Sequence, residues 1–209
     1  MNILHLDSSI LADASTSRLL SSAIVGELLQ QRPNAQVVHR DLVADPVAHL
    51  TGAIAAGFRA PAGAPVADPA TLGEHARSAQ LADEFLASEV IVIGAPMYNF
   101  SVASQLKAWI DRVAQPGRTF RYTADGPVGL SGGRRVIVAS TRGGMYSAGA
   151  AAGMDFQESY LKAFFGFLGI GDVQFVRAER LTKGAELREL SIGAARAAVR
   201  DAVTRALMS

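Results

Sequence analysis

Residues 90–113 read VIVIGAPMYNFSVASQLKAWIDRV, and this stretch decides the fold. Its first four residues are all β-branched, as in a strand buried on both faces. The apolar residues that follow recur at helical spacing and form one stripe, at Val102, Leu106, Trp109, Ile110 and Val113. We therefore expect a buried strand, a turn without charge, His or Cys, and an amphipathic helix. Ser101 is a plausible N-cap for that helix, and Pro116-Gly117 stops it.

The same alternation of strand and helix runs along the whole chain. Strands are predicted at Asn2–Leu6, Ala35–Arg40, Glu89–Ile93, Arg134–Ser140 and Asp172–Arg177. Helices are predicted at Ser17–Gln31, Thr71–Ala87, Ser101–Ala114, Phe156–Leu168 and Ala185–Met208. This order indicates an α/β fold, a doubly wound five-stranded parallel sheet with helices on both faces, built as a single domain over residues 1–209. In such folds ligands bind beyond the carboxyl ends of the strands.

Two long stretches do not fit this alternation. Leu42–Ala70 is rich in Pro, Ala and Gly, with a short helix predicted near Val47–Phe58. Gln115–Gly133 carries turn signals at Asp125-Gly126-Pro127 and at Gly132-Gly133, which favour a hairpin flap. Irregular segments of this length in a compact domain are usually functional or disordered.

Composition excludes several classes of function. The 209 residues carry a net charge of +1 without a basic stripe, so nucleic acid is not an expected partner. The chain has no cysteine, which removes disulfides, thiolate nucleophiles and thiolate metal sites. No apolar run approaches the roughly 20 residues of a membrane-spanning helix. The first residues enter a strand without a targeting segment, so we expect a cytoplasmic protein.

The chain also brings little reactive chemistry of its own. Its histidines, His5, His39, His49 and His75, are isolated in the sequence, and no pair of carboxylates suggests acid–base work. Gly129–Gly133 spells a nucleophile elbow but precedes a strand instead of joining strand to helix, which argues against a hydrolase. We therefore expect no catalytic side chain and no metal site.

Hydroxyl-bearing residues gather after the first predicted strand. That strand ends in Asp7-Ser8-Ser9, and Ser15-Thr16-Ser17 follows at the start of a helix. Unsatisfied N–H groups and the helix dipole at such a terminus favour a bound phosphate. The alternative is that Ser15 or Ser17 merely caps the helix. A cap needs one such residue and several are present, so we favour the phosphate site.

The next two strand ends suit a flat ligand. Met97, Tyr98 and Phe100 offer flat or polarizable surface, and Asn99 offers both a donor and an acceptor. Gly143-Gly144, after the fourth strand, permits close approach of backbone to a ligand. Ordinary capping of the core is the alternative. Beside a phosphate site, a planar cofactor with polar ring edges fits better, and flavin mononucleotide (FMN) meets that description.

These segments resemble the FMN-dependent NADH azoreductases, a family whose members are also quinone reductases. The matches are SS at Ser8-Ser9, STS at Ser15–Ser17, PMYNF at Pro96–Phe100, QLKAWIDR at Gln105–Arg112, TFRYTADGPVGL at Thr119–Leu130, TRGG at Thr141–Gly144 and FFGFLGI at Phe164–Ile170. They cover nearly the whole chain in order. Met145–Gly153 departs from the family, whose members are more polar there, and this departure leaves the mouth of the site and the substrate range open.

The resemblance implies a flavodoxin-like fold and a homodimer with two active sites at its interface. It also implies that FMN is bound by Ser9, Ser15, Thr16, Ser17, Pro96, Met97, Tyr98, Asn99, Phe100, Thr141, Arg142, Gly143 and Gly144. In the family, residues of the flap and of the partner subunit cover the flavin, and Phe120 and Phe164 resemble such positions.

The function implied is transfer of hydride from NADH or NADPH, through FMN, to a quinone or azo acceptor. One site used twice predicts ping-pong kinetics, and the flavin supplies the reactivity that the protein lacks. Arg59 is the only charge between Leu50 and Ala67 and could meet an anionic part of the nicotinamide cofactor; the alternative is a solvated loop arginine.

Two other classes of protein remain as alternatives. A flavodoxin-like electron carrier would bind FMN but need a protein partner, and the near-neutral charge argues against it, because carriers usually dock through a strong field of one sign. A regulatory flavin-binding protein would bind the cofactor without turnover. The sequence does not decide between NADH and NADPH, nor which acceptor is physiological.

Overall fold

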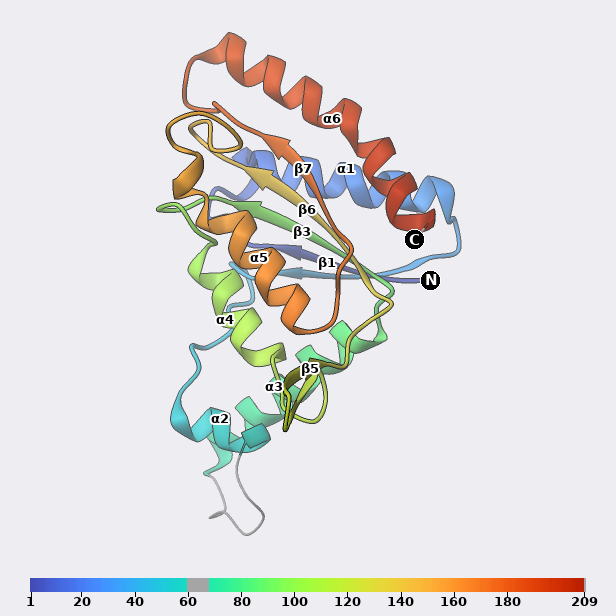
Figure 1. Cartoon of the computed structure of the whole chain (residues 1–209), viewed down its shortest axis with the longest axis vertical. Coiled ribbons are helices and arrows are strands. Elements are labelled where there is room, and N and C mark those ends of the chain that lie inside the picture. Colours follow the sequence, from blue (N-terminus) through green and yellow to red (C-terminus); the bar gives the residue numbers. More distant parts are fainter. Residues whose placement is uncertain (60–67, 209) are drawn as a thin grey trace.

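The computed structural model describes residues 1–59 and 68–208. Five strands form one parallel sheet in the order β2-β1-β3-β6-β7 (Figure 1). Their bounds are β1 (Asn2–Asp7), β2 (Gln36–Asp41), β3 (Val90–Pro96), β6 (Arg135–Thr141) and β7 (Val173–Ala178). The predicted fold class is therefore confirmed, and each strand lies within three residues of its predicted bounds.

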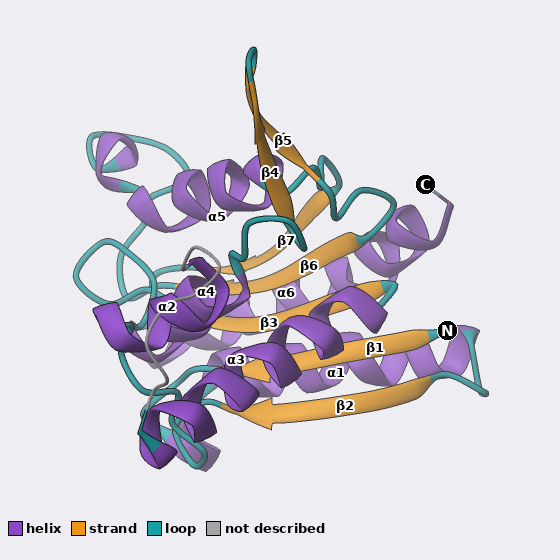
Figure 2. Ribbon diagram, turned by 90° about the horizontal axis from the view of Figure 1, so that it is seen from below, coloured by secondary structure: helices purple, strands orange, loops and turns teal. Residues whose placement is uncertain are grey.

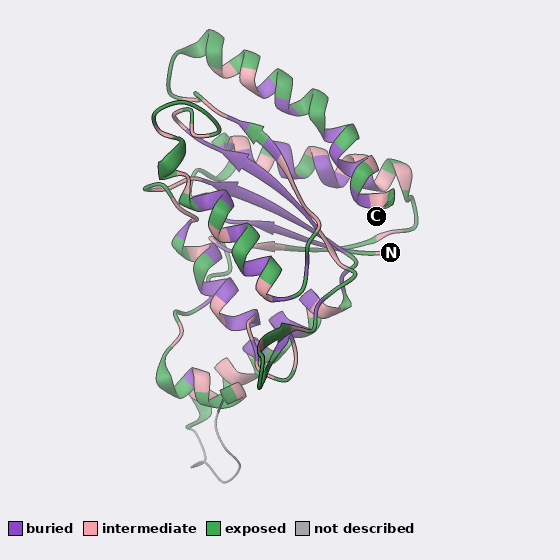
Figure 3. Ribbon diagram, in the orientation of Figure 1, coloured by how far each residue is buried: buried purple, intermediate pink, exposed green. Residues whose placement is uncertain are grey.

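Helices cover both faces of this sheet (Figure 1). On one face lie α1 (Thr16–Gln31) and α6 (Ala185–Met208), and on the other lie α3 (Pro69–Ala87), α4 (Ser104–Val113) and α5 (Phe156–Phe167). Within β3, Val90 and Val92 face the first layer, and Ile91 and Ile93 face the second. Figure 3 shows the result, central strands that are buried between helices whose outer sides are exposed. The uninterrupted β-branched run at 90–93 follows from this burial on both faces.

The edge strand β2 is the exception to this burial. Four of its six residues are exposed and the last two are intermediate. A strand at the edge of a sheet has a neighbour on one side only, and β2 pairs with β1 alone. The predicted short helix in the following segment is present as α2 (Gly52–Arg59), beginning five residues later than expected. Residues 60–67 of that irregular segment lie outside the described residues.

The predicted N-cap of α4 at Ser101 is wrong. The helix begins at Ser104, and its N-cap is Ala103, without a side-chain hydrogen bond. Ser101 belongs instead to a tight turn, in which its N–H donates to Tyr98 O (3.1 Å) and its carbonyl accepts from Tyr98 N (3.0 Å). Its backbone is committed to that turn, so it cannot also open the helix.

The hairpin flap predicted within Gln115–Gly133 is confirmed. β4 (Phe120–Thr123) and β5 (Gly126–Gly129) pair antiparallel and project from the body of the molecule (Figure 2). Its base is fixed to the end of α5, because Ser131 N donates to Leu168 O at 2.9 Å. The flap therefore rises beside the start of β7, at the amino ends of the sheet strands.

Gly129 carries the closest contact at this base. A Cβ added there would lie 2.1 Å from both Gly169 N and the carbonyl carbon of Leu168, which are backbone atoms that cannot rotate away. We expect Gly129→Ala to lower the free energy of unfolding by about 2–3 kcal/mol, as overpacking does. Gly132→Ala is the matched control, since its Cβ would meet nothing nearer than Gly169 O at 3.4 Å. Urea unfolding measures both variants, and equal midpoints would contradict the assignment.

None of the helices in the described part of the chain is long and apolar enough to cross a membrane.

Candidate functional site: a cavity at the carboxyl ends of β1, β3 and β6

The order of strands creates a crevice between β1 and β3. The chain leaves β1 toward α1 on one face of the sheet and leaves β3 toward α4 on the other, so the two loops diverge. In an open α/β sheet this switch point is where ligands bind. A cavity of about 330 Å³ lies there, lined by Ser9, Leu11, Ala14, Ser15, Thr16, Pro96, Met97, Tyr98, Thr141, Arg142, Gly143, Leu181, Thr182 and Arg188. Most of these residues were predicted from the sequence to bind the cofactor.

The first turn of α1 forms one end of this cavity. Ser15 is the N-cap, with its hydroxyl accepting from Arg18 N at 3.2 Å and lying 3.0 Å from the Ser17 hydroxyl. Among the described residues, the N–H groups of Thr16 and Ser17 donate to no protein atom. Free N–H groups at a helix N-terminus can bind an anion. Ser15 can therefore cap the helix while the same turn remains able to bind a phosphate.

A cation that the sequence analysis missed lies at the same end. Arg188 of α6 lines the cavity, and its Nη2 donates to Thr16 Oγ1 at 3.2 Å. Only the fold brings together two residues 172 positions apart, so no local pattern could have found it. Arg188 adds a positive charge to the free N–H groups of the helix, which further favours a phosphate.

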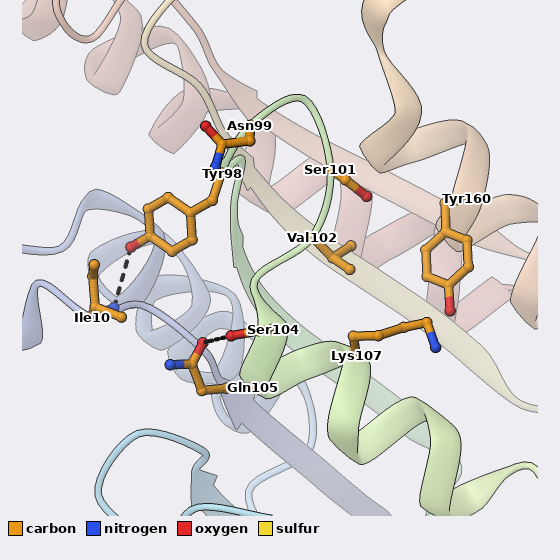
Figure 4. Close-up of a pocket in the computed structure, with 9 residues that line it drawn as sticks. All are labelled: Ile10, Tyr98, Asn99, Ser101, Val102, Ser104, Gln105, Lys107 and Tyr160. Carbon is orange, nitrogen blue, oxygen red and sulfur yellow. Dashed lines mark hydrogen bonds between the residues drawn. The ribbon is translucent and has the colours of Figure 1, made fainter. Parts of the chain in front are cut away.

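Tyr98 joins the first two loops of the cavity. Its hydroxyl accepts from Ile10 N at 3.2 Å and lies 3.4 Å from Ser9 Oγ. Tyr98 also lines a second cavity of about 480 Å³ that lies over α4 (Figure 4). The two cavities thus meet at the ring of Tyr98. The first turn of α1 and Arg188 line the first cavity and not the second.

The turn after β3 holds two residues in left-handed conformations. Asn99 has φ 47° and Phe100 has φ 71°, and positive φ at both central residues is typical of a type I′ turn. Asn tolerates this conformation, whereas Phe pays a cost of about 1–2 kcal/mol. Such strain at a strand end in a crevice is a feature of ligand sites. Asn99 lines the second cavity, and Phe100 lines a third, neighbouring one together with Gly144.

The turn after β6 leaves backbone donors free. The carbonyls of Gly143 and Gly144 accept from Thr182 N (3.3 Å) and Arg180 N (2.8 Å), but among the described residues their own N–H groups donate to no protein atom. A Cβ on Gly143 would lie 3.1 Å from Thr182 Oγ1. Glycine therefore avoids a tight contact with Thr182, and the free N–H groups of the turn can donate to a ligand.

FMN fits the residues that surround this crevice. The first turn of α1 and the Arg188 guanidinium could hold the phosphate. The Tyr98 ring and the Gly143 N–H, with Asn99 and Gly144 in the adjoining cavities, could meet a flat ring system with a polar edge. The second cavity leaves room on one side of Tyr98 for a further flat molecule.

A family model described by the flavodoxin-like fold matches residues 1–203 of the chain. The chain belongs to this family. It is 67% identical over 207 residues to FMN-dependent NADH:quinone oxidoreductase of Ralstonia nicotianae, with 99% of each chain covered. It is 59% identical over 203 residues to FMN-dependent NADH:quinone oxidoreductase 2 of Xanthomonas euvesicatoria pv. vesicatoria, covering 97% of this chain and 94% of the relative.

Solved structures agree with these relatives. An azoreductase from Bacillus anthracis superposes with a TM-score of 0.88 at 25% identity, with both chains covered in full. An FMN-dependent NADH-azoreductase from the same species, crystallised in complex with FMN, superposes with a TM-score of 0.87 at 25% identity, covering 98% of this chain and 97% of that one. The resemblance inferred from the sequence is thus confirmed.

Within this flavodoxin-like chain, Arg142 has a role that the sequence did not indicate. Its side chain is fully buried and forms ion pairs with Asp155 (2.9 Å), Glu179 (3.2 Å) and Glu158. Burial alone raises the pKa of Glu179, but hydrogen bonds from Ser147 and from backbone N–H groups, with the charge of Arg142, lower it below the usual value. The guanidinium of Arg142 is thus paired with carboxylates and is not free to bind a ligand. Its role is to stabilise the start of the turn after β6.

Three other predicted residues lie outside the crevice of this chain. Phe120 packs against Phe167 at the base of the flap, with ring centroids 4.5 Å apart. Phe164 packs against Phe165 at 5.1 Å. The guanidinium of Arg59 lies over the ring of Phe58, and Arg59 lines neither the crevice nor the second cavity. Their roles stay predictions. Ser17, which was predicted to bind the cofactor, does not line the crevice either. Its side chain is buried, and its hydroxyl lies 3.0 Å from that of Ser15.

The second cavity carries one notable titratable group. Tyr160 of α5 lies at its end opposite Tyr98 (Figure 4). Burial, with a smaller contribution from the charge of Asp111, raises the pKa of Tyr160 to about 12. Its hydroxyl therefore stays protonated at neutral pH and can donate a hydrogen bond to a bound molecule.

The expectation that all four histidines are isolated is wrong for His5 and His39. β1 and β2 pair in parallel with His5 opposite His39, so their rings lie 4.5 Å apart. Both approach the carboxylate of Asp7. The spacing His5-x-Asp7 puts both side chains on one face of a strand, but only the register of β2 adds His39.

Proposed function

We propose that this chain is an FMN-dependent NADH:quinone oxidoreductase that transfers hydride from a reduced nicotinamide nucleotide to a quinone, with azo compounds as further acceptors. The observation that carries the proposal is the crevice at three strand ends, which is lined by the first turn of α1, by Arg188 and by the free N–H of Gly143. The names of relatives up to 67% identical support it.

Each part of the crevice has a separate task in binding. The first turn of α1 and Arg188 would hold the phosphate of FMN. Tyr98 and Met97 would lie against the ring system, and the N–H groups of Gly143 and Gly144 would donate to its polar edge. Bound FMN supplies the capacity to accept and donate hydride. Donors fixed at the edge of the ring stabilise negative charge as it develops there. We assign no catalytic side chain.

Asn99 is proposed to donate or accept at the edge of the same ring. We expect Asn99→Gly to weaken FMN binding about tenfold, the loss of one hydrogen bond. Glycine adopts φ 47° without strain, so the turn itself is preserved. Fluorescence titration of the apoprotein with FMN measures the change, and thermal unfolding checks the fold. An unchanged dissociation constant and unchanged turnover would remove Asn99 from the site.

The second cavity is proposed as the place where nicotinamide and acceptor bind in turn. It borders the flavin crevice at Tyr98, and Tyr160 offers a donor within it. Because the two molecules share one place, the reaction should be ping-pong. Initial rates with varied NADH and quinone should give parallel double-reciprocal lines, whereas intersecting lines would show a ternary complex. The same assay separates the proposal from an electron carrier or a regulatory protein, neither of which consumes NADH with quinone alone.

We also propose that the active form is a homodimer. Phe120 and Phe164 lie away from the crevice of their own chain, so a flap or α5 from a second copy would have to supply aromatic cover. The flap exposes Tyr122, 74% accessible, together with Val128 and Leu130, which is apolar surface available for such a contact. Light scattering of purified protein should give twice the mass of the chain. A monomer with full activity would refute this part.

Three finer points complete the proposal. The chain acts as one domain over residues 1–209, in the cytoplasm, where reduced nicotinamide nucleotides are available. Arg59 is proposed to contact an anionic part of the nucleotide. If so, Arg59→Ala should raise the KM for NADH and reduce its dependence on salt. A KM with unchanged salt dependence would leave Arg59 as a solvated side chain.

A further inference from the structure

The cluster of His5, His39 and Asp7 lines neither the crevice nor the second cavity and plays no part in the proposed function. His5 and Asp7 are two residues apart on β1 and so share the face of the sheet that α1 covers. His39 reaches them from the edge strand β2. The Nε2 atoms of His5 and His39 lie 3.4 Å and 3.0 Å from the same oxygen, Oδ2 of Asp7.

The hydrogen bonds within this cluster are incomplete. His39 Nε2 can donate to Asp7 Oδ2, since a carboxylate only accepts. His5 Nε2 is buried, in a side chain that is 8% exposed, and has no hydrogen-bond partner among the described residues. Native proteins rarely leave a buried polar atom in this state, because the lost hydration is not replaced. This nitrogen faces the carboxylate at 3.4 Å without a well-formed hydrogen bond to it, and an ion between them would satisfy both groups.

The Asp7 carboxylate is held in one orientation. Its second oxygen, Oδ1, accepts from the Ser21 hydroxyl of α1 at 2.8 Å. Oδ1 also lies so close to Gly94 of β3 that a Cβ there would meet it at 2.4 Å. Oδ2 is thus fixed toward the two rings, as oxygens that ligate metals are fixed by hydrogen bonds to their neighbours.

The distances suit one class of ion. Around a tetrahedral Zn²⁺ with bonds of about 2.0–2.1 Å, neighbouring ligand atoms lie roughly 3.3 Å apart. The two distances from Asp7 Oδ2, 3.0 Å and 3.4 Å, lie on either side of that value. All three ligand atoms lie within 4.8 Å of one another, close enough to share one ion once the two rings turn toward it. Two imidazoles and one carboxylate are a donor set that zinc accepts readily.

We propose that His5 Nε2, His39 Nε2 and Asp7 Oδ2 bind one Zn²⁺, with water as the fourth ligand. The His39 side chain is 49% exposed, which leaves a path for the ion and a place for the water on the solvent side. Binding releases the proton from His39 Nε2 and gives the buried nitrogen of His5 its partner. The ion would tie the edge strand β2 to β1.

The test is calorimetric titration of untagged, FMN-loaded protein with Zn²⁺, after treatment with a chelator and in a buffer that does not bind metal. We expect one equivalent to bind, with a dissociation constant in the micromolar range or below. His39→Gln should weaken binding at least 30-fold. Saturating Zn²⁺ should raise the melting temperature of the wild type by roughly 5 °C. It should leave the melting temperature of His39→Gln unchanged.

The matched control is His49→Gln, an exposed histidine outside the cluster, which should bind as the wild type does. Because His39 is half-exposed on an edge strand, its replacement should leave the fold intact; Asp7→Asn is a second test if it does not. No saturable binding to the wild type, or equal affinity in His39→Gln, would overturn the proposal. Flavin absorbance in the same samples reports FMN binding independently of Zn²⁺ binding. Loss of FMN would therefore count against the proposed function and not against the zinc site.

Discussion

Thr16→Asp is expected to weaken FMN binding at least 100-fold while riboflavin binds with unchanged affinity. Thr16 lines the crevice at the first turn of α1, and Arg188 donates to its hydroxyl. A carboxylate there would neutralise Arg188 and repel the phosphate, and two like charges about 4 Å apart cost roughly 3–4 kcal/mol at a protein surface. Riboflavin lacks the phosphate and does not meet this repulsion.

The substitution should not harm the fold. An acidic residue in the first turn of a helix is favoured by the helix dipole, so α1 itself should be slightly stabilised. Thr16→Val is the control: it removes the hydroxyl without adding charge and should cost less than tenfold. Arg188→Gln should cost about tenfold through the loss of one charged contact. Fluorescence titrations with both flavins measure all three variants. An equal loss for riboflavin and FMN would place the phosphate elsewhere.

Arg142→Met is expected to lower the free energy of unfolding by about 3–5 kcal/mol. The guanidinium lies among three carboxylates in the interior, and its removal leaves Glu158, Asp155 and Glu179 without a buried counter-charge. Met fills similar volume, so the effect is electrostatic. Because this cluster lies beneath the Gly143-Gly144 turn, FMN binding should weaken as well.

Arg177→Met provides the comparison. Arg177 pairs with Glu158 alone and is 41% exposed, so its loss should cost about 1 kcal/mol or less. Urea unfolding of both variants, with and without FMN, gives the two free energies. Equal losses of unfolding free energy in the two variants would show that the buried ion pairs of Arg142 do not stabilise the fold more than the exposed pair of Arg177.

The sequence predicts the sheet and its helices well because their patterns are strong. The run of β-branched residues at 90–93 is buried on both faces, and the apolar stripe of α4 packs into one core. The flap followed from its turn residues. Ser101 failed as a cap because local preference for a hydroxyl does not reveal that the residue closes the preceding turn.

The parts of the candidate site that could be predicted from the sequence are short runs of neighbouring residues close to strand ends. Ser9, Tyr98 and Gly143 each follow a strand end, Thr16 opens α1, and the fold brings these segments together. Arg188 was missed because a long helix with scattered charges gives no sign of which arginine reaches a distant loop. The pair His5 and His39 was missed for the same kind of reason, since strand register is not visible in either segment alone.

The central claim is that three loops hold one FMN and that this flavin carries hydride. The most direct measurement is an anaerobic titration of the FMN-loaded protein with NADH, followed by a quinone, with the flavin absorbance recorded throughout. The account predicts that one equivalent of NADH per bound FMN bleaches the flavin and that one equivalent of quinone restores it. A protein that binds no FMN, or whose bound FMN is not bleached by NADH or NADPH, would contradict it.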